Sequence, residues 1–310
     1  KLWNASRFVL LQCEKGGVDP QTAVVESGKW KVESWSLADK ALLSELQQLI
    51  ANVTEGLEAY RLSEVGERLY SFVWDFFCDW CVEFSKGQET GSASTLPTQT
   101  IQQEEAHMIL LHALRTIVQL LHPYCPFVTE ELWSHIKPHN AGLLINEPWP
   151  ETDVALRDSV AAQQLQMIID IIKAIRSLRA ENGVASGATV DMILHADEQY
   201  VELIRSQQAH IQRLGKVRDW TLDAAPAKHE NAASVFLRGV EVHMPLEGLI
   251  DPTEEHARLT REKAQLEKFL LGVQAKLHNK QFVQHAPEDV IAKERQKEQD
   301  AQEKLQKIAE

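Results

Sequence analysis

The last sixty residues, 251–310, constrain the fold most, because their apolar residues recur along one helical seam. The spacings of seven, four, three and four are typical of a helix packed against one partner helix. These positions are Leu259, Leu266, Leu270, Val273 and Leu277. The period ends at His278, and Pro287 with two following acids predicts the start of a second helix. We therefore expect an antiparallel coiled-coil hairpin over residues 253–310, an arm roughly 40 Å long.

The loop between these two helices and the start of the second one carry a more specific pattern. It consists of Lys276-Leu277, residues 280–283 (Lys-Gln-Phe-Val) and residues 286–295 (Ala-Pro-Glu-Asp-Val-Ile-Ala-Lys-Glu-Arg). These segments resemble the C-terminal coiled-coil arm of bacterial-type valyl-tRNA synthetases. The resemblance implies an arm that lies against the outer corner of a tRNA. The apolar spacing alone leaves a solvated hairpin or a dimerisation coil open.

The composition is typical of a soluble globular protein of two or three domains. The chain has 310 residues, of which 44% are hydrophobic and 25% are charged. No apolar run approaches the roughly 18 residues that cross a bilayer, and no signal-peptide pattern opens the chain. We therefore expect a cytoplasmic protein. Residues 1–8 begin with lysine and already read as the interior of a helix, so we expect a segment of a longer polypeptide.

The formal charge of −13 does not favour a polyanion as partner. The distribution is uneven, because residues 251–310 hold 11 Lys and Arg against 12 Asp and Glu. Nucleic-acid contact needs a local basic face rather than a basic protein. The charge therefore permits RNA binding without indicating it.

Residues 1–150 predict an all-helical bundle. Amphipathic patterns indicate helices over residues 1–14, 61–85 and 101–121, and a further helix that begins after Ser36 as its N-cap. Pro123 and Pro126 predict a break before the next helix. The motifs at 2–8, 36–39, 77–80 and 122–133 resemble the anticodon-binding domain shared by valyl, isoleucyl and leucyl synthetases. Cys81 departs from that pattern, in which we expect tyrosine.

Residues 151–252 predict a small α/β domain. Helices are expected over 160–180 and 198–214. Alternating apolar residues indicate strands at 189–194, 220–222 and 234–245, the last a pair of strands bent near Gly239. The segment resembles the junction domain that carries the arm in valyl enzymes, with a family-like ending at 244–251. The expected fold class is mainly α, with this domain between the bundle and the arm.

Residues for catalysis or metal binding are not evident. Neither an HIGH-type nor a KMSKS-type signature is present, and no glycine-rich phosphate loop follows a strand. Cys78 and Cys81 form a CxxC pair without a second ligand pair, so we expect no metal site. The resemblance places ATP, magnesium, valine and the editing domain in a part of the enzyme outside this chain. We expect the chain alone to be inactive and to hold no cofactor.

Recognition of tRNA requires cations for phosphates and planar side chains for bases. In the bundle we select Asn4 and Arg7, for which an interhelix salt bridge is the alternative. In the junction domain we select a basic edge at spacings of three, for which a solvated face is the alternative: Lys173, Arg176 and Arg179. In the arm we select four cations and one aromatic residue: Arg258, Arg261, Lys268, Lys276 and Phe282. For Phe282 the alternative, and the favoured role, is closure of the hairpin.

The resemblance predicts the tRNA-binding C-terminal portion of a valyl-tRNA synthetase. Its expected partners are valine tRNA and the catalytic and editing domains of the same polypeptide, and we expect a monomer. Within the same class, an isoleucyl or leucyl enzyme is the alternative, although those families end without such an arm. From another class, a structural protein that dimerises through its hairpin stays open.

Overall fold

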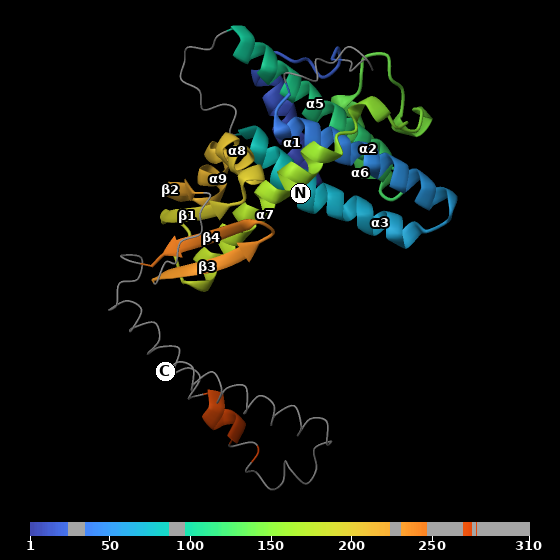
Figure 1. Cartoon of the computed structure of the whole chain (residues 1–310). Helices are drawn as coiled ribbons and strands as arrows, with labels where there is room; N and C mark the ends of the chain where they lie inside the picture. Colours follow the sequence, from blue (N-terminus) through green and yellow to red (C-terminus); the bar gives the residue numbers. More distant parts are fainter. Residues whose placement is uncertain (24–34, 87–96, 224–230, 247–268, 275–276, 278–310) are drawn as a thin grey trace. The chain divides into compact units, whose positions relative to one another are not determined.

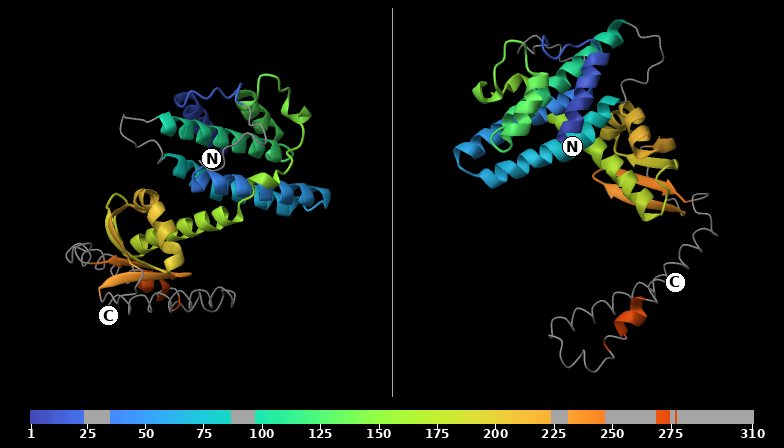
Figure 2. Two further views of the ribbon diagram at one scale, coloured as in Figure 1. Left: turned by 45° about the horizontal axis from the view of Figure 1, so that its top comes forward. Right: turned by 180° about the vertical axis from the view of Figure 1, so that it is seen from behind.

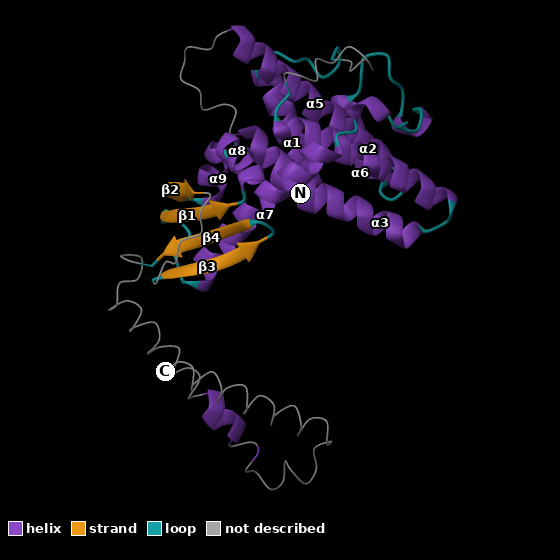
Figure 3. Ribbon diagram, viewed as in Figure 1, coloured by secondary structure: helices purple, strands orange, loops and turns teal. Residues whose placement is uncertain are grey.

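The computed structural model of the chain describes residues 1–23, 35–86, 97–223, 231–246, 269–274 and 277 (Figure 1). The chain divides into two compact units, Lys1–Pro245 and Leu246–Glu310. The described part is mainly helical with one small mixed sheet, as expected for the first two predicted domains (Figure 3). None of its helices is long and apolar enough to cross a membrane.

The N-terminal part of the first unit is a helical bundle. Its elements are α1 (Leu2–Lys15), α2 (Leu37–Glu58), α3 (Leu62–Ser71), a π-helix (Phe72–Cys81), α4 (Val82–Lys86), α5 (Pro97–Leu121) and α6 (Pro126–Ile136). Leucines of α2 and α5 fill the centre, where Leu42, Leu46, Leu110 and Leu114 are nearly inaccessible. This burial of one face of each amphipathic helix supplies most of the stability of the bundle.

Local capping signals set the ends of these helices as predicted. The Ser36 hydroxyl accepts a hydrogen bond from the Asp39 amide at 3.2 Å, and the Asp39 carboxylate accepts one from the Ser36 amide at 3.3 Å. This reciprocal capping box satisfies two amide groups at the start of α2. Pro126 occupies the first turn of α6 after Cys125, where its missing N–H costs no hydrogen bond.

The helix predicted over residues 61–85 forms, but ten of its residues are wound as a π-helix. The buried residues of the π-helix are Phe72, Val73, Phe77, Trp80 and Cys81. Spacings of four and three between Val73, Phe77 and Trp80 keep these side chains on the face that the sequence pattern predicted to be apolar.

The second part of the same unit is the predicted α/β module. Two short 3₁₀ turns (Leu144–Asn146 and Val154–Leu156) lead into it, followed by α7 (Ser159–Glu181), β1 (Val190–Ala196), α8 (Glu198–Ser206), α9 (Gln208–Gly215), β2 (Val217–Asp223), β3 (Ala232–Leu237) and β4 (Val240–Pro245). The sheet order is β2-β1-β4-β3; β1 and β2 are parallel, and β4 is antiparallel to both neighbours. The helices α7, α8 and α9 pack against the sheet (Figure 2).

The structure refines two predictions for this module, the bend near Gly239 and the helix over 198–214. The bend expected near Gly239 is the turn of the β3–β4 hairpin, where the glycine has a φ of +71° that other residues rarely adopt. The single helix expected over 198–214 is instead divided at Gln207. Its amide is shared between the carbonyls of Leu203 and Ile204, both at 3.2 Å, so the last turn tightens and the helix ends.

The predicted arm is described only at residues 269–274 and 277, which are helical. Val273, a predicted seam residue, is buried, whereas Phe269 and Leu271 are 49% and 67% exposed. This pattern agrees with the predicted seam on the first arm helix. The hairpin itself lies outside the described residues and stays a prediction, as do the three domain boundaries.

Candidate nucleic-acid interface

The outward face of α1 brings together an aromatic ring, an amide and a guanidinium. Trp3, Asn4 and Arg7 are all exposed, while Ala5, Val9 and other residues of the opposite face are buried in the bundle. Trp3 is 45% exposed although it is one of the largest apolar residues. Positions four apart on a helix are neighbours, so Trp3 and Arg7 lie on one stripe with Asn4 beside them.

Arg7 has its charge available for a ligand. It forms no ion pair with any residue in the described ranges, so the alternative of an interhelix salt bridge finds no support there. At the start of α1, by contrast, the Lys1 ammonium lies 2.7 Å from the Asp79 carboxylate. Trp3 was not among the predicted site residues. Its spacing of four from Arg7 on an amphipathic helix is the signal that would have selected it.

The predicted basic edge of α7 is present at Lys173 and Arg176, which are exposed. Both cations lie over the Trp80 ring, at 5.8 and 5.1 Å from its centroid. Arg176 also donates a hydrogen bond to the Leu214 carbonyl at 3.0 Å. The surrounding recess is acidic, since it also contains Asp75, Asp79 and Glu83. The two cations therefore join α7 to the π-helix, and their contact with phosphate stays a prediction.

Arg179 does not belong to that exposed edge, and its selection has to be corrected. It is 6% exposed, and its guanidinium donates to the carbonyls of Ala188 at 2.8 Å and of Ala185 and Lys216 at 3.3 Å. Six residues separate Arg179 from Lys173, and at 3.6 residues per turn this rotates its side chain by about 120° around the helix. Two successive steps of three residues therefore place the Arg179 side chain off the exposed face that carries Lys173.

The five candidate residues of the arm, Arg258, Arg261, Lys268, Lys276 and Phe282, lie outside the described residues. Their contact with tRNA, and the closure of the hairpin by Phe282, stay predictions.

The cysteines of the CxxC pair are free thiols on the π-helix. Cys81 is buried, and this burial raises its pKa well above the ordinary value, so the thiolate that a metal would bind is disfavoured. Within the described ranges, no group of three or more His, Cys, Asp or Glu residues is arranged to hold a metal ion.

Comparison with known families identifies the helical part. Residues 39–194, from α2 to β1, match the family described as the anticodon-binding domain of tRNA ligase, and this is half of the chain. The chain belongs to that family. Residues 251–310 match a second family, described as the valyl tRNA synthetase tRNA binding arm.

Curated relatives are similar to the chain over nearly its whole length. The valine–tRNA ligase of Listeria innocua is 35% identical over 316 residues, which cover 100% of the chain and 34% of the relative. That of Staphylococcus saprophyticus is 35% identical, with 98% and 33% covered, and that of Enterococcus faecalis is 33% identical, with 100% and 34% covered. The chain spans about a third of the length of these relatives, in their C-terminal part. The resemblance inferred from the motifs is confirmed.

Proposed function

We propose that this chain is the part of a valine–tRNA ligase that holds valine tRNA for aminoacylation by a catalytic domain elsewhere in the enzyme. The exposed face of α1 contacts the anticodon end of the tRNA, and the segment 251–310 contacts its outer corner. ATP, magnesium, valine and the editing domain belong to the remaining two thirds of the enzyme.

The observation that carries this proposal is the combination of side chains on α1. A guanidinium such as that of Arg7 binds phosphate, an amide such as that of Asn4 pairs with base edges, and an indole such as that of Trp3 stacks on an unpaired base. These are the three contacts by which proteins recognise single-stranded loops of RNA. The family matches over residues 39–194 and 251–310 support the same partner.

The test is binding of the chain to valine tRNA and to a non-cognate tRNA across a salt series. Arg7→Gln should weaken binding of valine tRNA about tenfold, or about 1.4 kcal/mol, and reduce the salt slope by about 0.7–0.9. Lys15→Gln is the matched control, because Lys15 is an exposed cation at the other end of α1. It should leave both values unchanged.

The contribution of the arm is measured by deleting residues 253–310, which should weaken binding tenfold or more. Undiminished binding without the arm would show that the arm is a spacer. A chain that binds no tRNA and instead dimerises with rising concentration would refute the proposal in favour of a structural hairpin.

A further inference from the structure

The turn between α2 and α3 lies at the end of the bundle away from the sheet (Figures 1 and 2). Large apolar side chains from three segments are exposed at this end, and we call them the corner patch. They are Tyr60 and Leu62 at the α2–α3 turn, Tyr124 and Phe127 at the α5–α6 turn, and Ile145 and Trp149 after α6. Phe127 is 92% exposed and Tyr60 is 87% exposed. Monomeric proteins rarely expose several large apolar side chains together, and such patches mark interaction sites.

Hydrogen bonds join the three segments of the corner patch. The Tyr124 hydroxyl donates to the Leu62 carbonyl at 2.6 Å, which connects the two turns. The Trp149 indole donates to the Thr54 hydroxyl at 2.8 Å, which fixes the third segment on α2. The corner patch is therefore a surface that the fold assembles from distant parts of the sequence.

Tyr60 holds its exposed ring in an unfavourable backbone conformation. Its φ is +57°, in the left-handed region that glycine adopts more readily. The Arg61 amide donates to the Gly56 carbonyl at 2.8 Å, so Tyr60 occupies the position after the end of α2 where glycine is usual. Residues held in such conformations are concentrated at functional sites. The turn alone does not require an aromatic residue at this position.

Acidic residues surround the corner patch. Nine Asp and Glu but only two arginines are present in the segments that build it, 54–68, 124–131 and 143–153. Both arginines are paired, Arg61 with Glu55 at 2.7 Å and Arg68 with Glu64 at 2.9 Å. Such a surface repels RNA phosphates. A second copy of the chain would place the same carboxylates opposite one another, because both sides of a two-fold interface are identical. The charge therefore favours a basic protein surface as the partner.

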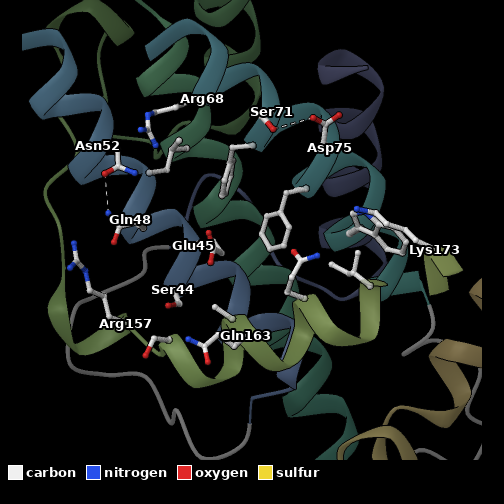
Figure 4. A pocket seen from close by; sticks show the side chains of 18 residues that line it. Ser44, Glu45, Gln48, Asn52, Arg68, Ser71, Asp75, Arg157, Gln163 and Lys173 are labelled. Atoms are coloured by element: carbon white, nitrogen blue, oxygen red, sulfur yellow. Dashed lines mark hydrogen bonds between the residues drawn. The ribbon is translucent and has the colours of Figure 1, made fainter. Parts of the chain in front are cut away.

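The groove beside α2 differs from the corner patch. It lies between the π-helix and α7 and is lined mainly by polar and charged side chains (Figure 4). The carboxylates of Glu45 and Asp75 accompany its cations, so the groove favours neither an apolar nor an anionic partner. The corner patch is the better candidate for a contact with protein.

The rest of the polypeptide is a partner that is always at hand. The chain covers 34% and 33% of the relatives from Listeria innocua and Staphylococcus saprophyticus. A covalent connection makes docking an intramolecular step, so that a small surface is sufficient. Interfaces between domains of one chain are accordingly modest in area and more polar than permanent interfaces between subunits.

We propose that the corner patch docks on another part of the same polypeptide, on an apolar surface flanked by lysine and arginine. Tyr60 and Phe127 enter this apolar surface, and the glutamates around them pair with its cations. The inference rests on the proposed function, because it takes this chain as one third of a valine–tRNA ligase. It adds a contact that involves no RNA.

Hydroxyl-radical oxidation read by mass spectrometry measures the exposure of single tyrosine and phenylalanine side chains. The experiment compares the chain 1–310 alone with the whole valine–tRNA ligase, both without tRNA. Tyr60 and Phe127 should be oxidised about tenfold more slowly in the whole ligase, because the core of an interface excludes water. Phe236 on β3 is 68% exposed and lies outside the corner patch, so its oxidation rate is the reference and should stay within about twofold.

Phe127→Glu removes an apolar anchor and adds a carboxylate to the acidic surroundings. In the whole ligase it should raise the oxidation rate of Tyr60 about fivefold or more, because burial of an unpaired charge opposes docking. Val160→Glu is the matched control, since Val160 is 61% exposed in the first turn of α7 and lies outside the corner patch. It should leave Tyr60 protected. Equal unfolding midpoints of the chain with either substitution show that the bundle is intact.

Tyr60→Gly tests the same contact without adding charge. Glycine tolerates the φ of +57°, so the chain alone should unfold at an equal or higher temperature. In the whole ligase, however, the oxidation rate of Phe127 should rise several-fold. A lower midpoint of the chain alone, together with unchanged protection of Phe127, would make Tyr60 a structural residue and overturn its place in the contact.

Equal oxidation of Tyr60 and Phe127 in the chain and in the whole ligase overturns the proposal. Protection that appears in the chain alone and increases with its concentration assigns the corner patch to a second copy, and protection that requires added valine tRNA assigns it to RNA; both results overturn the proposal. A chain that binds valine tRNA while its corner patch stays exposed in the whole ligase refutes this inference alone. A chain that binds no tRNA refutes the proposed function.

Discussion

Arg179 distinguishes a structural guanidinium from an RNA-binding one, and Arg179→Met tests which it is. The change keeps the length of the buried stem and removes three hydrogen bonds to backbone carbonyls. The bond to Ala188 has a normal length of 2.8 Å and contributes about 1.5–3 kcal/mol, as expected for a charged donor. The bonds to Ala185 and Lys216, at 3.3 Å, are long and add about 0.5 kcal/mol each. The free energy of unfolding should therefore fall by about 2.5–4 kcal/mol.

The assay pairs urea unfolding with the salt dependence of tRNA binding, and Lys173→Met serves as the counterpart on the same helix. Arg179→Met should lower the urea midpoint and leave the salt slope unchanged under conditions where it is folded. Lys173→Met should change stability by no more than about 0.5–1 kcal/mol, since the Lys173 side chain is exposed, and should reduce the salt slope. Unchanged stability of Arg179→Met together with a lower salt slope would refute the burial argument and restore Arg179 to the interface.

Two further substitutions test the fold. Gly239→Ala should destabilise the chain by about 1–3 kcal/mol, because the glycine has a φ of +71° and an added Cβ would lie 2.5 Å from the Asp197 carboxylate. Gly187→Ala is the control and should cause no loss of stability, because a Cβ added there meets nothing within 4 Å. Equal thermal midpoints of the two variants would contradict the reasoning. Burial, and less strongly the charge of Arg115, lower the pKa of His112 to about 4. Between about pH 6.5 and 4 the unfolded chain therefore binds a proton that the folded chain does not, and stability decreases as the pH falls. His112→Gln should remove about 2 kcal/mol of the stability lost between pH 7 and 4.5 in urea unfolding, and an unaltered pH dependence would exclude His112 as its source.

Predictions that depended on neighbouring residues in the sequence were the reliable ones. The Ser36 cap, the break at Pro123 and Pro126, and the turn at Gly239 are set by hydrogen bonds or dihedral restrictions within a few residues. The same holds for the alternation that indicated the strands of the α/β module. The family motifs extended this information to the function, which no periodicity contains.

The sequence by itself determined the helical bundle, the α/β module and the exposed position of Asn4 and Arg7, because amphipathic spacing decides which face of a helix is buried. Only the tertiary structure decided what each charge meets. Arg179 donates hydrogen bonds to carbonyls of the loop before β1 and of the residue before β2. Lys173 and Arg176 lie over Trp80, almost a hundred residues earlier in the sequence. The groove beside α2 likewise combines residues of α2, α3, the π-helix and α7. Such contacts depend on how distant segments pack, and the spacing of residues along one helix carries no information about the partner that the fold will bring to it.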